Sequence, residues 1–217
     1  MNYKDTYNKD YFDGKNSFFY MFGYGNLFNT ARSFNQMYQR IEKHINKKNE
    51  VRVLDVGCAY GFMLERFPDN FMKYGIDVSQ YAIEIAKKRH PEIDYQVGEI
   101  EKKLPYQSHF FDVVVINDVI EHIEHPEKVL KNIYSVLKKG GILYVTTPNL
   151  NIIRKMLYNH ADKREHHISL FTHSNLLKLL IRERFAILEH WSFFILYFYI
   201  RLKFNLGIES GFICKKL

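Results

Sequence analysis

The 217-residue sequence is 47% hydrophobic and 25% charged, which supplies a core for one domain and excludes a disordered or low-complexity chain. Its first residues are polar and acidic where a signal peptide would be apolar, and its longest apolar run, residues 193–200, is far shorter than the ~20 residues of a membrane span. Two cysteines give neither a disulfide framework nor a metal-binding spacing. We therefore expect a cytoplasmic protein, either a monomer or a homodimer.

The formal net charge of +7 is unevenly distributed along the chain. Residues 1–150 carry 20 basic and 19 acidic side chains, whereas residues 151–217 carry 11 and 5, a surplus of +1 against +6. The C-terminal surplus is either a solvated basic face or an attraction for an anionic substrate, a nucleic acid or a membrane surface.

Residues 1–48 precede the first predicted strand and form an N-terminal cap. They hold an aromatic-rich segment followed by a predicted helix over residues 27–47. Such a segment could cover the edge of a sheet, or close over a ligand at the ends of the strands.

From residue 49 to 148, apolar runs of strand length alternate with segments of helical period. This alternation predicts an α/β, Rossmann-like, doubly wound sheet with helices on both faces. The predicted strands cover residues 51–56, 72–77, 94–98, 111–117 and 141–147, and the predicted helices cover residues 61–66, 81–90 and 126–138.

The regular alternation of predicted strands and helices ends after Pro148, and residues 149–217 form a predicted substrate-side segment. We expect an irregular stretch over 149–171, a helix with Thr172 as its N-cap, and strands over 185–191 and 211–215. The run 193–200 lacks strict alternation, so we do not expect a half-buried strand there. It fills the core or mediates self-association, or residues 193–203 contact a lipophilic acceptor or a membrane surface. No linker divides the chain, which predicts a single domain over 1–217.

The most informative motif for function is the stretch VLDVGCAYG, residues 53–61. An apolar strand ends near Asp55, and Gly57 and Gly61 let the backbone turn sharply and approach a ligand. Asp77 ends the next strand twenty positions after Gly57, where a carboxylate can accept hydrogen bonds from both hydroxyls of an adenosine ribose. This pairing indicates an adenosine-containing ligand.

The spacing of the glycines limits which adenosine-containing ligand the loop can bind. A dinucleotide fingerprint would need glycine where Ala59 and Phe62 stand, and no Gly-Lys-Ser/Thr sequence of a Walker loop is present. NAD and ATP are therefore disfavoured. A loop with few glycines suits a ligand that carries an amino-acid tail and no phosphate.

These motifs resemble the class I S-adenosylmethionine-dependent methyltransferases over residues 50–215. The resemblance implies a seven-stranded sheet with an antiparallel last strand, the cofactor S-adenosyl-L-methionine and the product S-adenosyl-L-homocysteine. It places Gly57, Cys58 and Gly61 at the methionine end of the cofactor. The remaining implied cofactor contacts are Asp77 and Val78 at the ribose, Glu99 and Ile100 at the adenine, Asn117 at the end of the fourth strand, and Asp55 at the end of the first.

The segment after the fourth strand separates branches of this family. The Asn/Asp-Pro-Pro-Tyr/Phe pattern of amino-group methyltransferases is missing, and DVIEH resembles ubiquinone-biosynthesis-type O-methyltransferases. In that group two acids and a histidine at this spacing are implicated in metal binding, which would be Asp118, Glu121 and His122 here. The first is Asp where the group usually has Glu. We assign no metal, although hard oxygen ligands would favour Mg²⁺.

A hydroxyl acceptor needs a base, and His122 is the first candidate because its ordinary pKa is near neutrality. His167, with His166 beside it, is the second. We therefore expect a methyltransferase that acts by in-line displacement on a small molecule, at oxygen rather than nitrogen or carbon. Two alternatives stay open: an RNA or other polyanion methyltransferase, and an inactive partner subunit that binds the cofactor.

Overall fold

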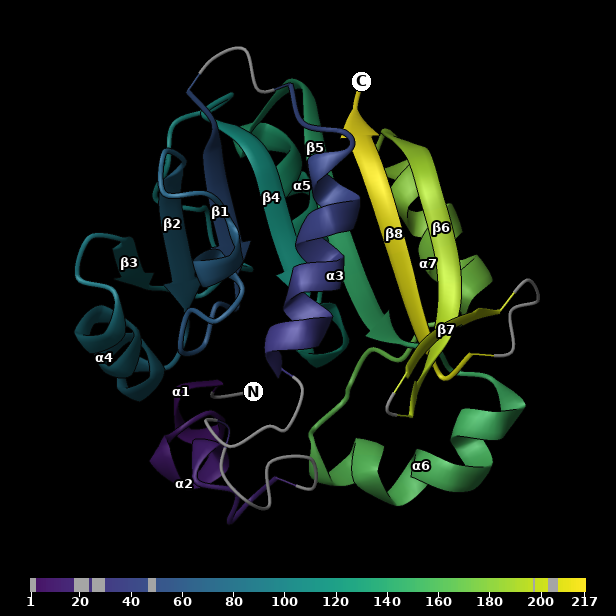
Figure 1. Ribbon diagram of the computed structural model, residues 1–217. Helices are drawn as coiled ribbons and strands as arrows, with labels where there is room; N and C mark the ends of the chain where they lie inside the picture. The colour runs from purple at the N-terminus through teal and green to yellow at the C-terminus, as the bar shows by residue number, and fades with distance from the viewer. Residues whose placement is uncertain (1–2, 18–23, 25–29, 47–49, 197, 203–206) are drawn as a thin grey trace.

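The computed structural model describes residues 3–17, 24, 30–46, 50–196, 198–202 and 207–217, with side chains except at residues 4, 30–32 and 194–202. Its centre is one twisted sheet with helices on both faces (Figure 1). The strands are β1 (Arg52–Val56), β2 (Met72–Asp77), β3 (Asp94–Val97), β4 (Phe111–Asn117), β5 (Leu137–Pro148), β6 (Phe185–Leu196), β7 (Phe198–Leu202) and β8 (Glu209–Lys216).

The strand order is β3-β2-β1-β4-β5-β8-β6-β7. The first five strands pair in parallel, and β8 inserts antiparallel between β5 and β6. This confirms the predicted seven-strand frame with an antiparallel last strand. The short strand β7 extends the sheet beyond that frame, antiparallel to β6.

Helix α3 (Thr30–Glu42) covers one face of the sheet, and α5 (Pro126–Val136) and α7 (His173–Arg182) lie behind the other (Figure 1). Helix α4 (Gln80–Arg89) lies beside β3. The short helices α1 (Tyr3–Thr6) and α2 (Lys9–Phe12), together with α6 (Ile152–Arg164), lie beyond the carboxyl ends of the parallel strands. No helix among the described residues combines the length and the apolar character needed to cross a bilayer.

The central strands are buried on both faces, which is why their sequences read as continuous apolar runs. Successive side chains point to opposite faces of a strand. Val53 and Val113 therefore join the cluster under α3, while their neighbours Leu54 and Val114 join the cluster under α5 and α7.

Two predictions of local structure were wrong. Residues 61–66 form only a single 3₁₀ turn, Leu64–Arg66, because Gly61 has a left-handed φ of 81° and Phe67 is already extended. The stretch 149–171 contains α6. In the run where no half-buried strand was expected, residues 193–196 lie in β6 and residues 198–200 lie in β7. Phe193 is buried, and the other side chains of the predicted 193–203 contact surface lie outside the described residues.

Candidate functional site

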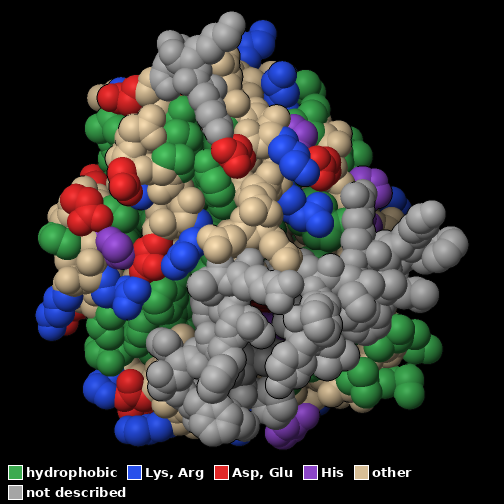
Figure 2. All heavy atoms as spheres, in the orientation of Figure 1, with side chains coloured by type: hydrophobic (Ala, Val, Ile, Leu, Met, Phe, Trp, Pro, Cys, Tyr) green, Lys and Arg blue, Asp and Glu red, His purple; other side chains and the backbone are tan. Residues whose placement is uncertain are grey.

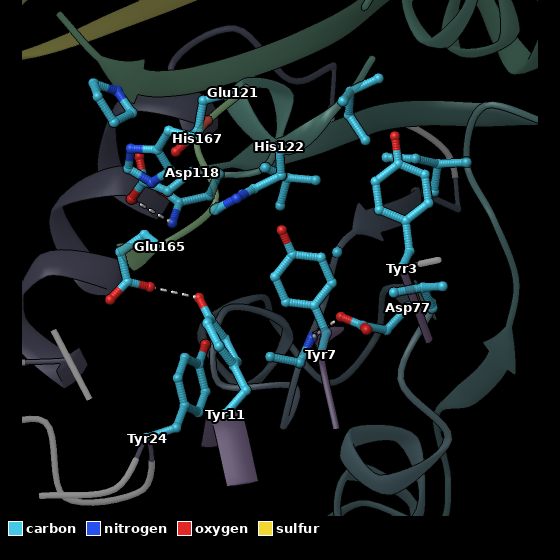
Figure 3. A pocket seen from close by; sticks show the side chains of 18 of the residues that line it. Tyr3, Tyr7, Tyr11, Tyr24, Asp77, Asp118, Glu121, His122, Glu165 and His167 are labelled. Atoms are coloured by element: carbon cyan, nitrogen blue, oxygen red, sulfur yellow. Dashed lines mark hydrogen bonds between the residues drawn. The ribbon is translucent and has the colours of Figure 1, made fainter. Parts of the chain in front are cut away.

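A cavity of about 540 Å³ opens at the carboxyl ends of the parallel strands. This volume lies in the range of about 300–1,000 Å³ that is usual for small-molecule sites. Residues of the strand ends, the N-terminal helices and the segment around α6 line it together. Figure 3 shows Asp77 and Tyr3 at one end, Tyr7 in the middle, and Asp118, Glu121, His122 and His167 at the other end.

Asp77 is fixed at the first end by backbone amides. The N–H of Ala59 donates to Asp77 Oδ2 at 2.9 Å, and the N–H of Ser79 donates to Oδ1 at 2.8 Å. Burial raises the pKa of Asp77, and these hydrogen bonds oppose that rise. The side chain is only 7% exposed and lines the cavity, so what remains exposed can meet a ligand.

The loop after β1 requires glycine at two positions. Gly57 has a φ of 76°, and a Cβ there would lie 2.3 Å from Val119 Cγ2. Gly61 has a φ of 81°, and a Cβ there would lie 2.1 Å from the hydroxyl oxygen of Tyr95. The left-handed conformation and the close approach both disfavour a side chain at these positions.

Six of the nine predicted cofactor residues line the cavity: Gly57, Asp77, Val78, Glu99, Ile100 and Asn117. Three lie behind the lining. Cys58 is buried in the core cluster under α3, and Gly61 packs against Tyr95. Asp55 is 3% exposed, and burial together with the charge of Asp77 raises its pKa to about 7. The side chains of Asp55 and Cys58 and the Cα of Gly61 therefore do not face the cavity in this structure.

His122 and His167, the two predicted bases, meet at the opposite end. Their ring centroids are 4.8 Å apart, and one ligand atom from each lies within 4.8 Å of one from Glu121. His122 Nδ1 is buried without a hydrogen-bond partner among the described residues. Burial lowers the pKa of His122 to about 3, so its ring is neutral. His166, the alternative beside His167, does not line the cavity.

The end of α6 positions His167. His166 has a left-handed φ of 59°, and the backbone N–H of His167 donates to the carbonyl of Asp162 at 3.0 Å. This is the Schellman arrangement of a helix C-terminus. It also brings His167 Nδ1 to 2.9 Å from Asp162 Oδ1.

A buried ion-pair network lies under this end. Arg154 is 1% exposed and donates to both Asp162 oxygens, and its Nη1 donates to Glu209 Oε1 at 2.7 Å. Burial raises the pKa of Glu209 to about 8, and its Oε2 has no hydrogen-bond partner among the described residues. Arg154 and Glu209 both line the cavity.

The N-terminal helices close the cavity. The Tyr11 hydroxyl donates to Glu165 Oε2 at 2.9 Å, and the Tyr3 hydroxyl donates to Glu101 Oε2 at 2.7 Å. The Tyr7 hydroxyl between them is buried without a hydrogen-bond partner among the described residues. These tyrosines belong to the aromatic-rich segment that was expected to cover a sheet edge or to close over a ligand, but none of them was predicted as a site residue. The spacing of Tyr3, Tyr7 and Tyr11 at every fourth position was the available signal.

The metal triad implied by the resemblance fits only in part. Glu121 and His122 lie together, but the third member of the group is His167 and not Asp118. Asp118 Oδ1 accepts from Thr146 Oγ1 at 3.1 Å, and Oδ2 accepts from Asn117 Nδ2 at 3.2 Å. The shorter Asp side chain is thus held toward β5. A donor set of one carboxylate and two imidazoles can hold a divalent ion.

Apolar and aromatic side chains make up most of the cavity lining, and acidic side chains prevail among its charged residues. The only Lys or Arg among its described lining residues is Arg154, which is already paired. The acidic lining residues are Asp77, Glu99, Glu101, Asp118, Glu121, Glu165 and Glu209. This lining favours a neutral or cationic ligand that donates hydrogen bonds.

Residues 54–145 match the family described as "Methyltransferase domain". The match spans less than half of the chain, and the strand order of the sheet, with its antiparallel β8, is the one expected for a doubly wound α/β fold.

Two curated relatives are ubiquinone biosynthesis O-methyltransferases. The protein from Coxiella burnetii is 30% identical over 146 residues, which cover 61% of this chain and 62% of that protein. The mitochondrial protein from Saccharomyces cerevisiae is 29% identical over 64% of this chain and 49% of its own length. The chain thus spans less than two thirds of either relative.

A solved structure from Thermotoga maritima, described as a S-adenosylmethionine-dependent methyltransferase and possible histamine N-methyltransferase, superposes with a TM-score of 0.66. It is 23% identical and covers 89% of this chain and 94% of that one. At this identity the likeness supports the fold alone.

Proposed function

We propose that this protein binds S-adenosylmethionine and transfers its methyl group to a hydroxyl of a small molecule. The observation that carries the proposal is the single cavity that joins Asp77 at one end to His122 and His167 at the other. One end offers a carboxylate to a ribose, and the other offers imidazole nitrogens to an acceptor. Residues Gly57, Val78, Glu99, Ile100 and Asn117 complete the proposed cofactor end.

Methyl transfer from a sulfonium needs alignment more than covalent help, because the leaving group is already good. The cavity supplies that alignment in an enclosed space. The acceptor hydroxyl also needs a proton acceptor. Neutral His122, with its unpartnered Nδ1, and His167, held by Asp162, are the proposed bases.

The acidic lining supports a small neutral or cationic acceptor over a polyanion. Figure 2 shows basic and acidic side chains interspersed on the face in view, with no continuous basic tract among the side chains it colours. The RNA alternative requires salt-dependent binding with a steep slope. Absence of RNA binding at low salt would remove it.

Isothermal titration with S-adenosylhomocysteine tests the proposal. We expect micromolar binding, lowered at least 100-fold by Asp77→Ala because the ribose loses its carboxylate partner. Asp69→Ala is the matched control, since the Asp69 side chain is fully exposed outside the cavity. No binding by the parent protein contradicts the proposal.

Turnover needs a second measurement. A screen of hydroxyl compounds with methyl-labelled cofactor should yield a methylated product. Cofactor binding without any product across a broad screen would support the inactive-subunit alternative instead.

A further inference from the structure

We propose that Glu121, His122 and His167 bind a divalent transition-metal ion, with His167 taking the place that the family resemblance assigns to Asp118. The ligand atoms of these three residues gather within 4.8 Å of one another at the end of the cavity away from Asp77. The proposal that these residues bind an ion does not depend on the proposed methyl transfer. Only the role of the ion in the reaction rests on that proposed function.

The separation is compatible with one ion. Ligand atoms that lie about 2.1 Å from a common ion are roughly 3–4 Å apart, so the three groups need to close by about 1 Å on binding. The three residues come from two segments of the backbone: Glu121 and His122 lie in the 3₁₀ turn Ile120–His122, and His167 follows α6. We expect small side-chain rotations to bring their ligand atoms to these distances.

His167 carries the partner that fixes a metal-binding imidazole. His167 Nδ1 is engaged by Asp162 Oδ1 at 2.9 Å, which leaves Nε2 to bind a ligand. Asp162 is in turn held by Arg154 through Nε and Nη2. A carboxylate on the far nitrogen of a metal-binding histidine fixes its tautomer and orientation.

His122 differs from His167 in the surroundings of its ring. Its Nδ1 is buried and has no hydrogen-bond partner among the described residues. An unpaired buried nitrogen costs free energy, so it indicates a ligand that this structure does not hold. Glu121 supplies the anionic ligand, and Thr147 Oγ1 donates to its Oε2 at 2.9 Å.

The donor set selects the kind of ion. Two imidazoles and one carboxylate suit Mn²⁺, Fe²⁺, Co²⁺ or Zn²⁺, whereas Mg²⁺ prefers oxygen ligands. Three protein ligands leave open positions that face the cavity. A bound ion would lower the pKa of an acceptor hydroxyl. It would thereby replace the two imidazoles in the role of base proposed above, because their free nitrogens would then bind the ion.

The test is a titration of untagged, EDTA-treated protein with CoCl₂, followed by visible absorption and calorimetry. We expect one equivalent to bind with a Kd of micromolar or tighter, and Mg²⁺ to bind at least 100-fold more weakly. His167→Ala and His167→Gln should each weaken Co²⁺ binding at least 100-fold. Asp162→Asn should weaken it 10- to 100-fold, because a partner of the ligand is altered.

Asp118→Asn is the discriminating control, and it should change Co²⁺ affinity less than threefold. Circular dichroism and S-adenosylhomocysteine binding verify that each variant is folded. If Asp118→Asn abolishes binding while the His167 variants bind normally, the ligand set is the one implied by the family. If the parent binds no Co²⁺ at one equivalent, the proposal is wrong. Metal binding without S-adenosylhomocysteine binding would instead contradict the proposed function.

Discussion

At the Asp77 end of the cavity, the lining comes mostly from the ends of neighbouring strands and the short loops that follow them, with Tyr3 of α1 beside them. At the histidine end, the lining comes from three distant parts of the chain: the N-terminal helices, the turn after β4 and the end of α6. The first end is built from local sequence, whereas the second exists only after long-range packing. The two ends should therefore respond differently to substitution.

The largest effect should come from breaking the buried network at the histidine end. Arg154→Met leaves Asp162 and Glu209 buried without their cation, and we expect the free energy of unfolding to fall by about 3–5 kcal/mol. Chemical denaturation measures it. Arg182→Met, on the exposed end of α7, is the control and should change stability by no more than about 0.5 kcal/mol. Equal effects would show that the network does not support the fold.

The same contrast explains which parts were predictable. The bounds of β2 and β4 were predicted to the residue, because a buried parallel strand is a compact apolar run between turns. The glycine loop and Asp77 followed from their spacing along the chain. Such signals are contained in a few consecutive residues.

Helix α6 was not predicted because its apolar side chains are exposed and its charged side chains are buried, the reverse of the usual pattern. Ile152, Met156 and Leu157 are 69–80% exposed, while Arg154 and Asp162 are buried. A reading that expects apolar residues inside finds no helical face there. The pairing of Arg154 with Glu209 and the closure by Tyr3 and Tyr11 depend on contacts between residues 55 to 154 positions apart, which sequence periodicity does not encode.

A pH effect should distinguish the Asp77 end. The pKa of Asp55 is raised to about 7 in the folded protein, above its ordinary value of 3.8. Below pH 4 the carboxyl is protonated in both states. Between pH 4 and 7 only the unfolded state ionises, so stability falls by up to about 4 kcal/mol, and above pH 7 the loss is constant.

Asp55→Asn should remove that slope. The measurement is the difference in unfolding free energy between parent and variant from pH 4 to 8, since Glu209 adds a slope of the same sign to both proteins. A constant difference across this range would mean that Asp55 titrates normally.

A smaller effect should come from the glycine loop. Gly61→Ala forces a Cβ toward the Tyr95 hydroxyl in a left-handed conformation, and we expect a loss of about 3 kcal/mol. Gly140→Ala shares the positive φ, but its Cβ would meet only Lys215 Cε at 3.5 Å, so about 1 kcal/mol is expected. Tyr95→Phe should partly rescue Gly61→Ala. If Tyr95→Phe does not rescue Gly61→Ala, the whole loss of stability comes from the left-handed backbone conformation.

The smallest effect is expected at Cys58, and it tests whether this side chain contacts the cofactor. The resemblance implies contact by Cys58, but its side chain is buried, and its Sγ lies 2.8 Å from where a Cβ on Gly75 would stand. Only the backbone of Cys58 can then shape the loop. Cys58→Ala should lower stability by about 1 kcal/mol and change S-adenosylhomocysteine affinity less than twofold in calorimetry. A tenfold loss of affinity without unfolding would show that the thiol side chain reaches the ligand, and that the loop moves when the ligand binds.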